Sequence, residues 1–438
     1  MSPRFVVSPP YLPQNVSPRL YSTHSTRPIQ PPSPLSMAQR VPQLYRSILE
    51  KLVRFEDPRW KMKDARPVLF RDLVRENFQS KDVAPKAQRS ELRFAGIDLN
   101  PNGYSHVEVG SLYPIPTPDK PNTGVQRLYT RLQHTRSTLR ELFTRLHASH
   151  PLLKHHVSFY GELSIIVPQP NGSIEKQLSF IDEFLPLYDY AKSNGITLMP
   201  ALLGNACPDY CLGNVKRDFD TDLDCIHRAI TRLRQFDPQM KIIVYVSGAF
   251  GVFADKKAEY GPQFYVDQTQ KIITTTMPSI VSLGDTFGLG TYQDIDLMMR
   301  TLNTSPTTPQ ICLHSHGYDA QSIEENIERL AQNNATFLAR GGNMFDGNSI
   351  PLSSKNFVVS ESCSEHGWSG NMPLSLLLCQ SLLQGFSVNG RSTLEEKTEL
   401  MTRVVHYLNY HGATDPVFSA ITPELLKAAI PTTHRFSP

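Results

Sequence analysis

Cysteine is scarce in this sequence of 438 residues, which contains only six. Six thiols are too few for a disulfide-stabilised scaffold in a chain of this length, and the string CPDYC has the wrong spacing for a redox-active CxxC pair. A two-cysteine metal site at Cys207 and Cys211 stays open, but core or loop thiols are the simpler interpretation. Long apolar runs are also missing, because none reaches the roughly 18 residues of a membrane span. We therefore expect a soluble protein in a reducing compartment, without a membrane partner.

Positive charge is not concentrated anywhere in the body of the chain. Lysine and arginine total 44 against 41 acidic residues, which gives a net charge of +3. Five arginines precede Glu50, the first acidic residue, so the remainder carries a net charge of about −2. A nucleic-acid binder needs a concentrated basic face. The sequence therefore predicts no nucleic-acid partner.

Residues 1–45 are rich in proline, serine and arginine and lack apolar periodicity, so we expect a disordered extension. The absence of acidic residues there and the string RLYS at residues 19–22 resemble a mitochondrial presequence. Nine prolines among the first 34 residues leave little room for an amphipathic targeting helix. The predicted location is the cytoplasm, with the mitochondrial matrix as the alternative.

The rest of the chain alternates short apolar runs with segments of helical spacing, which predicts buried parallel strands joined by helices. Eight such units close into a (β/α)8 TIM barrel. We expect the barrel to span residues 65–390, with a helical segment over residues 391–438 packed on it. The eight predicted strands are PVLFRD, SHVEVGS, LSIIVP, ITLMPALL, KIIVYVSGA, SIVSLGD, QICLHSH and ATFLARG.

Candidate functional residues cluster at the predicted strand ends, where TIM barrels carry their chemistry. His314 and His316 are two residues apart in a strand, so both imidazoles should project from one face and could bind one metal ion. An ordinary hydrogen-bonded histidine pair is the alternative. Asp72, Glu108 and Asp285 lie at or near the ends of other predicted strands.

Five strings in these positions resemble, in the same order, the hydroxymethylglutaryl-coenzyme A (HMG-CoA) lyase family of the DRE-TIM metallolyases, also called pyruvate-carboxyltransferase-like barrels. The resemblance covers approximately residues 65–390, and SLGDTFGLGT is its most specific string. The other strings are FRDLVRENFQ, HVEVGS, YVSGAFG and LHSHG.

The resemblance implies a site for Mg²⁺ or Mn²⁺ with Asp72, His314, His316 and Asn371 as ligands. Asn371 is preferred over Asn348 for the Gly-Asn position because an apolar helix follows it. One carboxylate, two imidazoles and one amide form a mixed nitrogen and oxygen set that suits these ions.

The resemblance also implies roles for three charged residues. Arg71 would stabilise the enolate oxygen formed when the carbon–carbon bond breaks. A buried salt bridge that begins a helix is the alternative for Arg71 and Asp72. Glu108 would position the arginine, and Asp285 would handle substrate or a proton. The alternative for Asp285 is a structural one, in which its carboxylate satisfies backbone donors of the following turn.

The sequence departs from the family after ATFLARGG, where the family has a glycine-rich loop with a catalytic cysteine followed by proline. Residues 343–370 replace that loop with a long insertion, which we expect to close over the substrate as a mobile lid. Cys363 lies close to the family's spacing from Asn371 and is a candidate acid, and His366 is the alternative. A polar surface insertion would give neither residue a role. Gly317 also replaces the usual aspartate or asparagine after the paired histidines, so the metal could be kept while the substrate changes.

The predicted function is a divalent-metal lyase that cleaves a 3-hydroxyacyl-coenzyme A to acetyl-coenzyme A and a keto acid. Its partner would be a small acyl-coenzyme A or a keto or hydroxy acid, and a homodimer stays open. Two alternatives remain: a Claisen synthase or aldolase of the same superfamily, such as an isopropylmalate-synthase-like enzyme, and a barrel that has lost catalysis.

Overall fold

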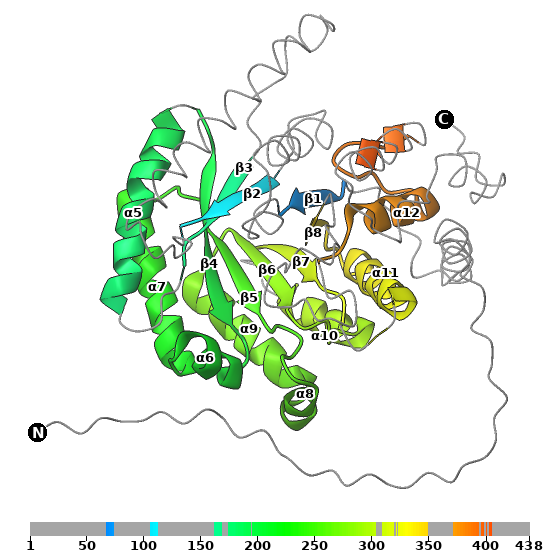
Figure 1. The fold of residues 1–438 in the computed structure, drawn as a ribbon, viewed down its shortest axis with the longest axis horizontal. Coiled ribbons are helices and arrows are strands. Elements are labelled where there is room, and N and C mark those ends of the chain that lie inside the picture. Colours follow the sequence, from blue (N-terminus) through cyan, green and yellow to red (C-terminus); the bar gives the residue numbers. More distant parts are fainter. Residues whose placement is uncertain are drawn as a thin grey trace, which may run out of the picture.

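The computed structural model describes residues 67–73, 106–112, 162–168, 174–193, 195–303, 309–318, 321, 323–348, 371–393, 396–397, 400 and 403–404. Its centre is a closed barrel of eight parallel strands in chain order, with the first strand paired to the last (Figure 1). The strands are β1 (Leu69–Asp72), β2 (His106–Ser111), β3 (Glu162–Ile166), β4 (Leu198–Asn205), β5 (Ile243–Ser247), β6 (Ile280–Asp285), β7 (Gln310–Ser315) and β8 (Met344–Gly347). The predicted TIM barrel is confirmed.

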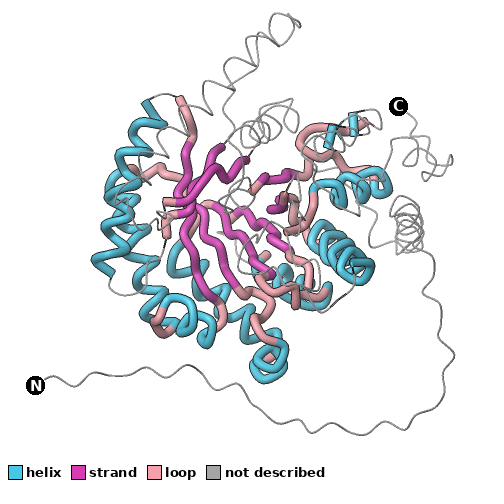
Figure 2. Tube along the Cα trace, in the orientation of Figure 1, coloured by secondary structure: helices cyan, strands magenta, loops and turns pink. Residues whose placement is uncertain are grey.

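Helices follow the strands from β3 onward and lie around the outside of the barrel (Figure 2). The described helices are α5 (Ile174–Ser193), α6 (Pro208–Val215), α7 (Phe219–Phe236), α8 (Ala254–Tyr260), α9 (Pro262–Thr276), α10 (Tyr292–Leu302), α11 (Ile323–Ala339) and α12 (Leu374–Gln384). None of the helices within the described ranges is long and apolar enough to cross a membrane.

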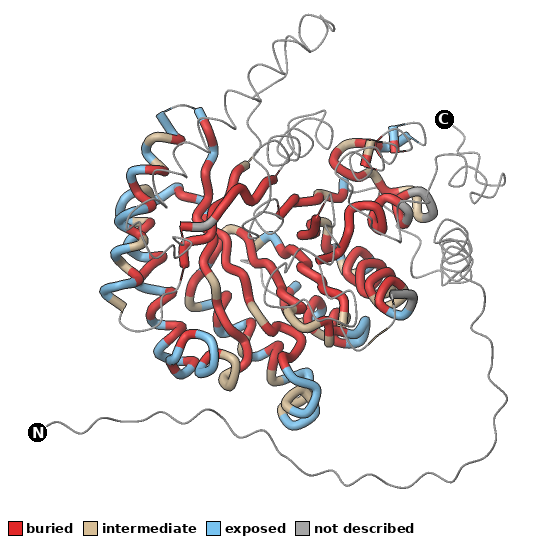
Figure 3. The backbone as a smooth tube through the Cα atoms, viewed as in Figure 1, coloured by how far each residue is buried: buried red, intermediate tan, exposed pale blue. Residues whose placement is uncertain are grey.

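The strands are buried on both sides, which is why they read as continuous apolar runs (Figure 3). Alternate residues of β6 show the pattern, since Val281 and Leu283 pack in the large core between strands and helices. Tyr245 and Cys312 belong to a second, smaller cluster of residues. That smaller cluster is drawn from β3 to β8 and fills the inside of the barrel.

The eighth strand was wrongly placed by the sequence pattern. ATFLARG is not a strand, because its first five residues form the end of α11. Phe337 and Leu338 are buried at helical spacing from Leu330 and Ala331, and a short apolar run does not by itself distinguish strand from helix. The strand is the next segment, MFDG, after a turn with Gly341 at φ 86°.

The proposed extension over residues 1–45 lies outside the described residues, and so do residues 349–370 of the predicted insertion. Residues 343–348, the beginning of that insertion, form β8 and its flanks. In the C-terminal segment, Leu400 and Val404 are buried in the large core. The domain boundaries themselves stay a prediction.

Candidate active site

Side chains from five strands meet inside the barrel near the carboxyl ends of the strands. Arg71 of β1 and His314 of β7 are both in register with Asp346 of β8, so the three side chains point inward at one level. Tyr245 of β5 and Glu108 of β2 complete the group, and all five residues are buried. The barrel closure brings together residues that are as much as 275 positions apart in the chain.

Arg71 and Asp346 form a fully buried ion pair. Arg71 Nε donates to Asp346 Oδ1 over 2.5 Å, and Nη2 donates to Oδ2. The Ser282 hydroxyl and the Cys312 thiol also donate to this carboxylate, over 2.6 and 3.0 Å. Burial alone would raise the pKa of Asp346, but Arg71 and His314 together outweigh burial and hold that pKa well below its usual range. Asp346 therefore stays charged and fixes the plane of the guanidinium.

Glu108 is connected to Arg71 through Tyr245. The Tyr245 hydroxyl donates to Glu108 Oε2 over 2.5 Å, and Arg71 Cζ lies 5.0 Å from the centre of the tyrosine ring. Burial, together with the nearby carboxylates, raises the pKa of Tyr245, so the phenol keeps its proton and remains a donor. The same ring packs edge-on against His314, with centroids 5.7 Å apart.

His314 and His316 lie on the same side of the chain, as the two-residue period of a strand predicts. Their Nε2 atoms are 2.6 Å apart, and the rings are tilted with centroids separated by 4.7 Å. His314 Nδ1 is 3.5 Å from Asp346 Oδ2. The carboxylate that holds Arg71 therefore also lies against the histidine pair.

Asn371 lies beside His316, since the two residues form an antiparallel bridge. Asn371 Nδ2 donates to Asn348 Oδ1 over 2.6 Å, and Asn348 Nδ2 donates to the carbonyl of Leu73 over 3.2 Å. These two bonds fix both amide orientations, with Oδ1 of Asn371 as its acceptor atom. The two asparagines that competed for the ligand role are thus neighbours, and Asn348 orients Asn371.

Two imidazoles with neighbouring Nε2 atoms and an asparagine bridged to His316 offer the mixed nitrogen and oxygen ligands that suit a divalent cation. The described residues contain no group of three or more His, Cys, Asp and Glu side chains that could hold an ion, so Asp72 is not gathered with the two histidines. Asp72 follows the inward-facing Arg71 in β1, and alternation places it on the other face of the strand. Its role as a ligand stays a prediction.

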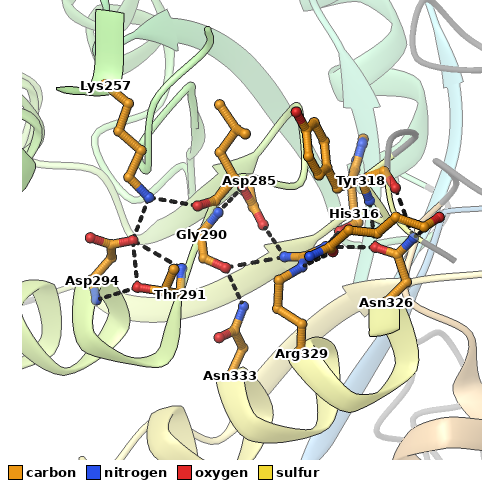
Figure 4. A network of polar contacts seen from close by, with 12 residues as sticks. Lys257, Asp285, Gly290, Thr291, Asp294, His316, Tyr318, Asn326, Arg329 and Asn333 are labelled. Atoms are coloured by element: carbon orange, nitrogen blue, oxygen red, sulfur yellow. Dashed lines mark hydrogen bonds and ion pairs between the residues drawn. The ribbon is translucent and has the colours of Figure 1, made fainter. Parts of the chain in front are cut away.

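Asp285 is held on the helix side of β6, in line with Val281 and Leu283 and not with the inward-facing Ser282 (Figure 4). Its Oδ1 accepts from the Gly290 N–H over 2.8 Å, and its Oδ2 accepts from Arg329 over 3.0 Å. Burial raises the pKa of Asp285, and Arg329 opposes that effect. This geometry favours the structural interpretation over proton handling.

Two predicted residues lie outside the described part of the chain, and two residues of the site were not predicted from the sequence. Cys363 and His366 lie outside the described residues, so their roles as acids stay predictions. Asp346 and Tyr245 were missed as site residues. Tyr245 lies in the string YVSGAFG, where its inward position in a predicted strand was the available signal. Asp346 was missed because the misplaced eighth strand hid its position at a strand end.

No protein-family model and no curated protein matches the sequence. Solved structures do match the fold. The HMG-CoA lyase of Bacillus subtilis has a TM-score of 0.52 and 15% identity, over 80% of this chain and 96% of that chain. The corresponding lyase of Pseudomonas aeruginosa has a TM-score of 0.54 and 14% identity, over 84% and 99%. That of Brucella melitensis has a TM-score of 0.51 and 15% identity, over 80% and 100%. At these identities the likeness establishes the fold, and the chain shares the barrel of the HMG-CoA lyases.

Proposed function

We propose that the protein is a divalent-metal-dependent lyase that cleaves a 3-hydroxyacyl-coenzyme A, similar to HMG-CoA, into acetyl-coenzyme A and a keto acid. The ordered motifs and the shared barrel support this proposal. So does the inward arrangement of Arg71, His314 and Glu108 near the carboxyl ends of the strands, where TIM barrels carry out their reactions.

One observation carries the proposal. Asp346 occupies Nε and Nη2 of Arg71, whereas Nη1 is buried and has no hydrogen-bond partner among the described residues. Buried donors are nearly always paired, and an unpaired donor costs about 1–3 kcal/mol. An oxygen that gains negative charge during the reaction would satisfy this donor. Arg71 would then stabilise the enolate without gaining or losing a proton, because burial lowers its pKa but Asp346, Tyr245 and Cys312 together raise the pKa above its usual value.

His314, His316 and Asn371 would hold Mg²⁺ or Mn²⁺. When bound, the ion supplies Lewis-acid polarisation of the substrate oxygens. The Nε2 atoms of the two histidines lie 2.6 Å apart, and the bond from Asn371 Nδ2 to Asn348 leaves Oδ1 as the acceptor atom of Asn371.

Glu108 is an inward-facing carboxylate of the site, as is Asp346, which is bound to Arg71; we assign Glu108 the removal of the 3-hydroxyl proton in place of Asp285. The Tyr245 hydroxyl, which donates to Oε2, holds the carboxylate in one orientation. Cys363 or His366 would return a proton to the departing carbanion. The buried surroundings exclude water from this chemistry, which strengthens each charge interaction.

The test is acetyl-coenzyme A release from HMG-CoA and related 3-hydroxyacyl thioesters by the purified full-length protein, with and without Mn²⁺. We expect turnover that a chelator abolishes and added Mn²⁺ restores. Arg71→Lys should lose turnover and still bind Mn²⁺, because lysine keeps the charge but cannot form the bidentate pair and present a third donor. Bound Mn²⁺ without cleavage of any thioester would refute the lyase and favour a barrel that has lost catalysis.

A further inference from the structure

Arg329 of α11 links the ends of β6 and β7 on the outside of the barrel (Figure 4). Its side chain is only 12% exposed. The guanidinium has five N–H donors, and the structure gives it five acceptors from three segments of chain. These acceptors are Asp285 Oδ2 at 3.0 Å, the Gly290 carbonyl at 3.1 Å, the His316 carbonyl at 2.6 Å, Asn326 Oδ1 at 3.1 Å and Gln321 Oε1 at 3.2 Å.

The loop after β6 is shaped to meet this arginine. A side chain at Gly290 would approach Asp285 to 3.0 Å, so glycine lets the Gly290 N–H reach the carboxylate. Gly288 has a φ of 67°, and a Cβ there would lie 2.5 Å from the carbonyl oxygen of Gly317. The loops after β6 and β7 are therefore packed backbone against backbone, directly beside His316.

The same face of α11 holds the chain that follows His316. Asn326 accepts from the Tyr318 N–H over 2.6 Å and donates to the Tyr318 carbonyl over 2.8 Å. Asn333, one turn beyond Arg329, donates to the Gly290 carbonyl over 2.9 Å. Asn326, Arg329 and Asn333 recur at helical spacing, so one face of the helix fixes both loops.

We propose that Asp285 and Arg329 are positioning residues that set the place of the His316 imidazole, and through it the geometry of the metal site. Asp285 orients the guanidinium, and the guanidinium holds the backbone carbonyl of His316 itself. This inference rests on the proposed metal site. In this proposal Asp285 lies on the outside of the barrel and does not contact the substrate. It acts through Arg329, which holds the backbone of His316.

The loop offers a matched control. Lys257 donates to the Leu289 carbonyl and to Asp294 Oδ2, each over 2.5 Å, and so braces the same loop from its other side. These two bonds join Lys257 to the loop and to α10, and not to residue 316. Loss of Lys257 loosens the loop and removes a positive charge near Asp285, but it keeps the bond from Arg329 to the His316 carbonyl.

The experiment measures Mn²⁺ binding by the metal-free full-length protein, by calorimetry, for wild type and for Asp285→Asn, Arg329→Gln, the double variant and Lys257→Gln. Loss of a group that orients a metal ligand typically weakens affinity about 10–100-fold. We expect at least a tenfold loss in Asp285→Asn and Arg329→Gln, and a double variant no weaker than the worse single variant, because the two residues act as one unit. Lys257→Gln should bind like wild type.

Arg329→Lys provides a second variant if Arg329→Gln does not fold. It keeps the charge opposite Asp285 but has a single nitrogen in place of the planar fork, so it too should weaken Mn²⁺ binding. Unchanged Mn²⁺ affinity in the Asp285 and Arg329 variants, with a metal-binding wild type, would overturn the inference. An Asp285→Asn protein with lower turnover and intact affinity would likewise return Asp285 to proton handling. Wild type that binds no Mn²⁺ would instead refute the metal site itself.

Discussion

Replacing Asp346 by alanine removes the carboxylate that neutralises and orients the buried Arg71 guanidinium. Asp346 and Arg71 are both 0% exposed, so the change would leave a guanidinium buried without its counter-charge. Breaking a buried ion pair from one side costs about 3–5 kcal/mol of stability. The hydroxyl of Ser282 would also lose its acceptor, for about 1 kcal/mol more. Against a typical total stability of about 5–15 kcal/mol, Asp346→Ala should be among the most destabilising changes in the barrel.

The measurement is the free energy of unfolding in urea, followed by far-ultraviolet circular dichroism. Asp182→Ala is the matched control, because Asp182 pairs with Arg232 at 3.1 Å but both side chains are about half exposed. An exposed pair of this kind contributes at most about 1 kcal/mol. The double variant Arg71→Met with Asp346→Leu should regain most of the stability, since apolar residues can replace both members of a buried pair. A loss for Asp346→Ala no larger than that of the control would refute the reasoning.

Three further changes test other parts of the structure. Glu108→Gln should lower kcat about 10²–10⁴-fold and leave Mn²⁺ affinity intact, as expected of a general base; equal losses in both would assign Glu108 a structural role. Gly347→Ala should destabilise the barrel and weaken Mn²⁺ binding, because its Cβ would overlap the Met372 carbonyl next to Asn371, whereas Gly213→Ala, with open space around it, should affect neither. Burial lowers the pKa of His106 to about 4, below its unfolded value near 6.5. The stability that neutral His106 provides is therefore present above pH 6.5 and lost as the pH falls toward 4, so His106→Gln should flatten the unfolding free energy over that window, measured by urea unfolding at each pH.

Much of the fold was predictable because its strands are buried on both faces. Seven of the eight strands coincide with apolar runs in the sequence, and the inward direction of Arg71 and His314 follows from strand alternation. The eighth strand, MFDG, has four residues with an acid and a glycine among them, so no apolar pattern marks it. Phe345 and Met344 pack there only because β1 and β7 lie on either side.

The contacts of the site were less predictable, because they join residues far apart in the chain. Tyr245 reaches Glu108 across 137 positions, and Arg71 reaches Asp346 across 275. Nothing in the residues flanking Asp346 indicates an arginine partner. The amide pair of Asn348 and Asn371 shows the same limit, since the sequence presented the two residues as competitors and the fold makes them neighbours.

The strings that resemble the lyases fall into two groups: some contain residues that face the barrel interior, and one contains residues that shape a loop. Arg71 and His314 are in strings whose functional residues face the barrel interior, so their likeness bears on chemistry. SLGDTFGLGT is different, because its residues have structural contacts. Gly288 and Gly290 shape the turn after β6, and Asp285 binds the Gly290 N–H and Arg329. A close match in that string follows from packing two loops against each other, and it would persist in a barrel that had changed its substrate. In the proposed reaction, the choice of substrate would therefore depend more on what reaches the Nη1 donor of Arg71 than on the most similar string in the sequence.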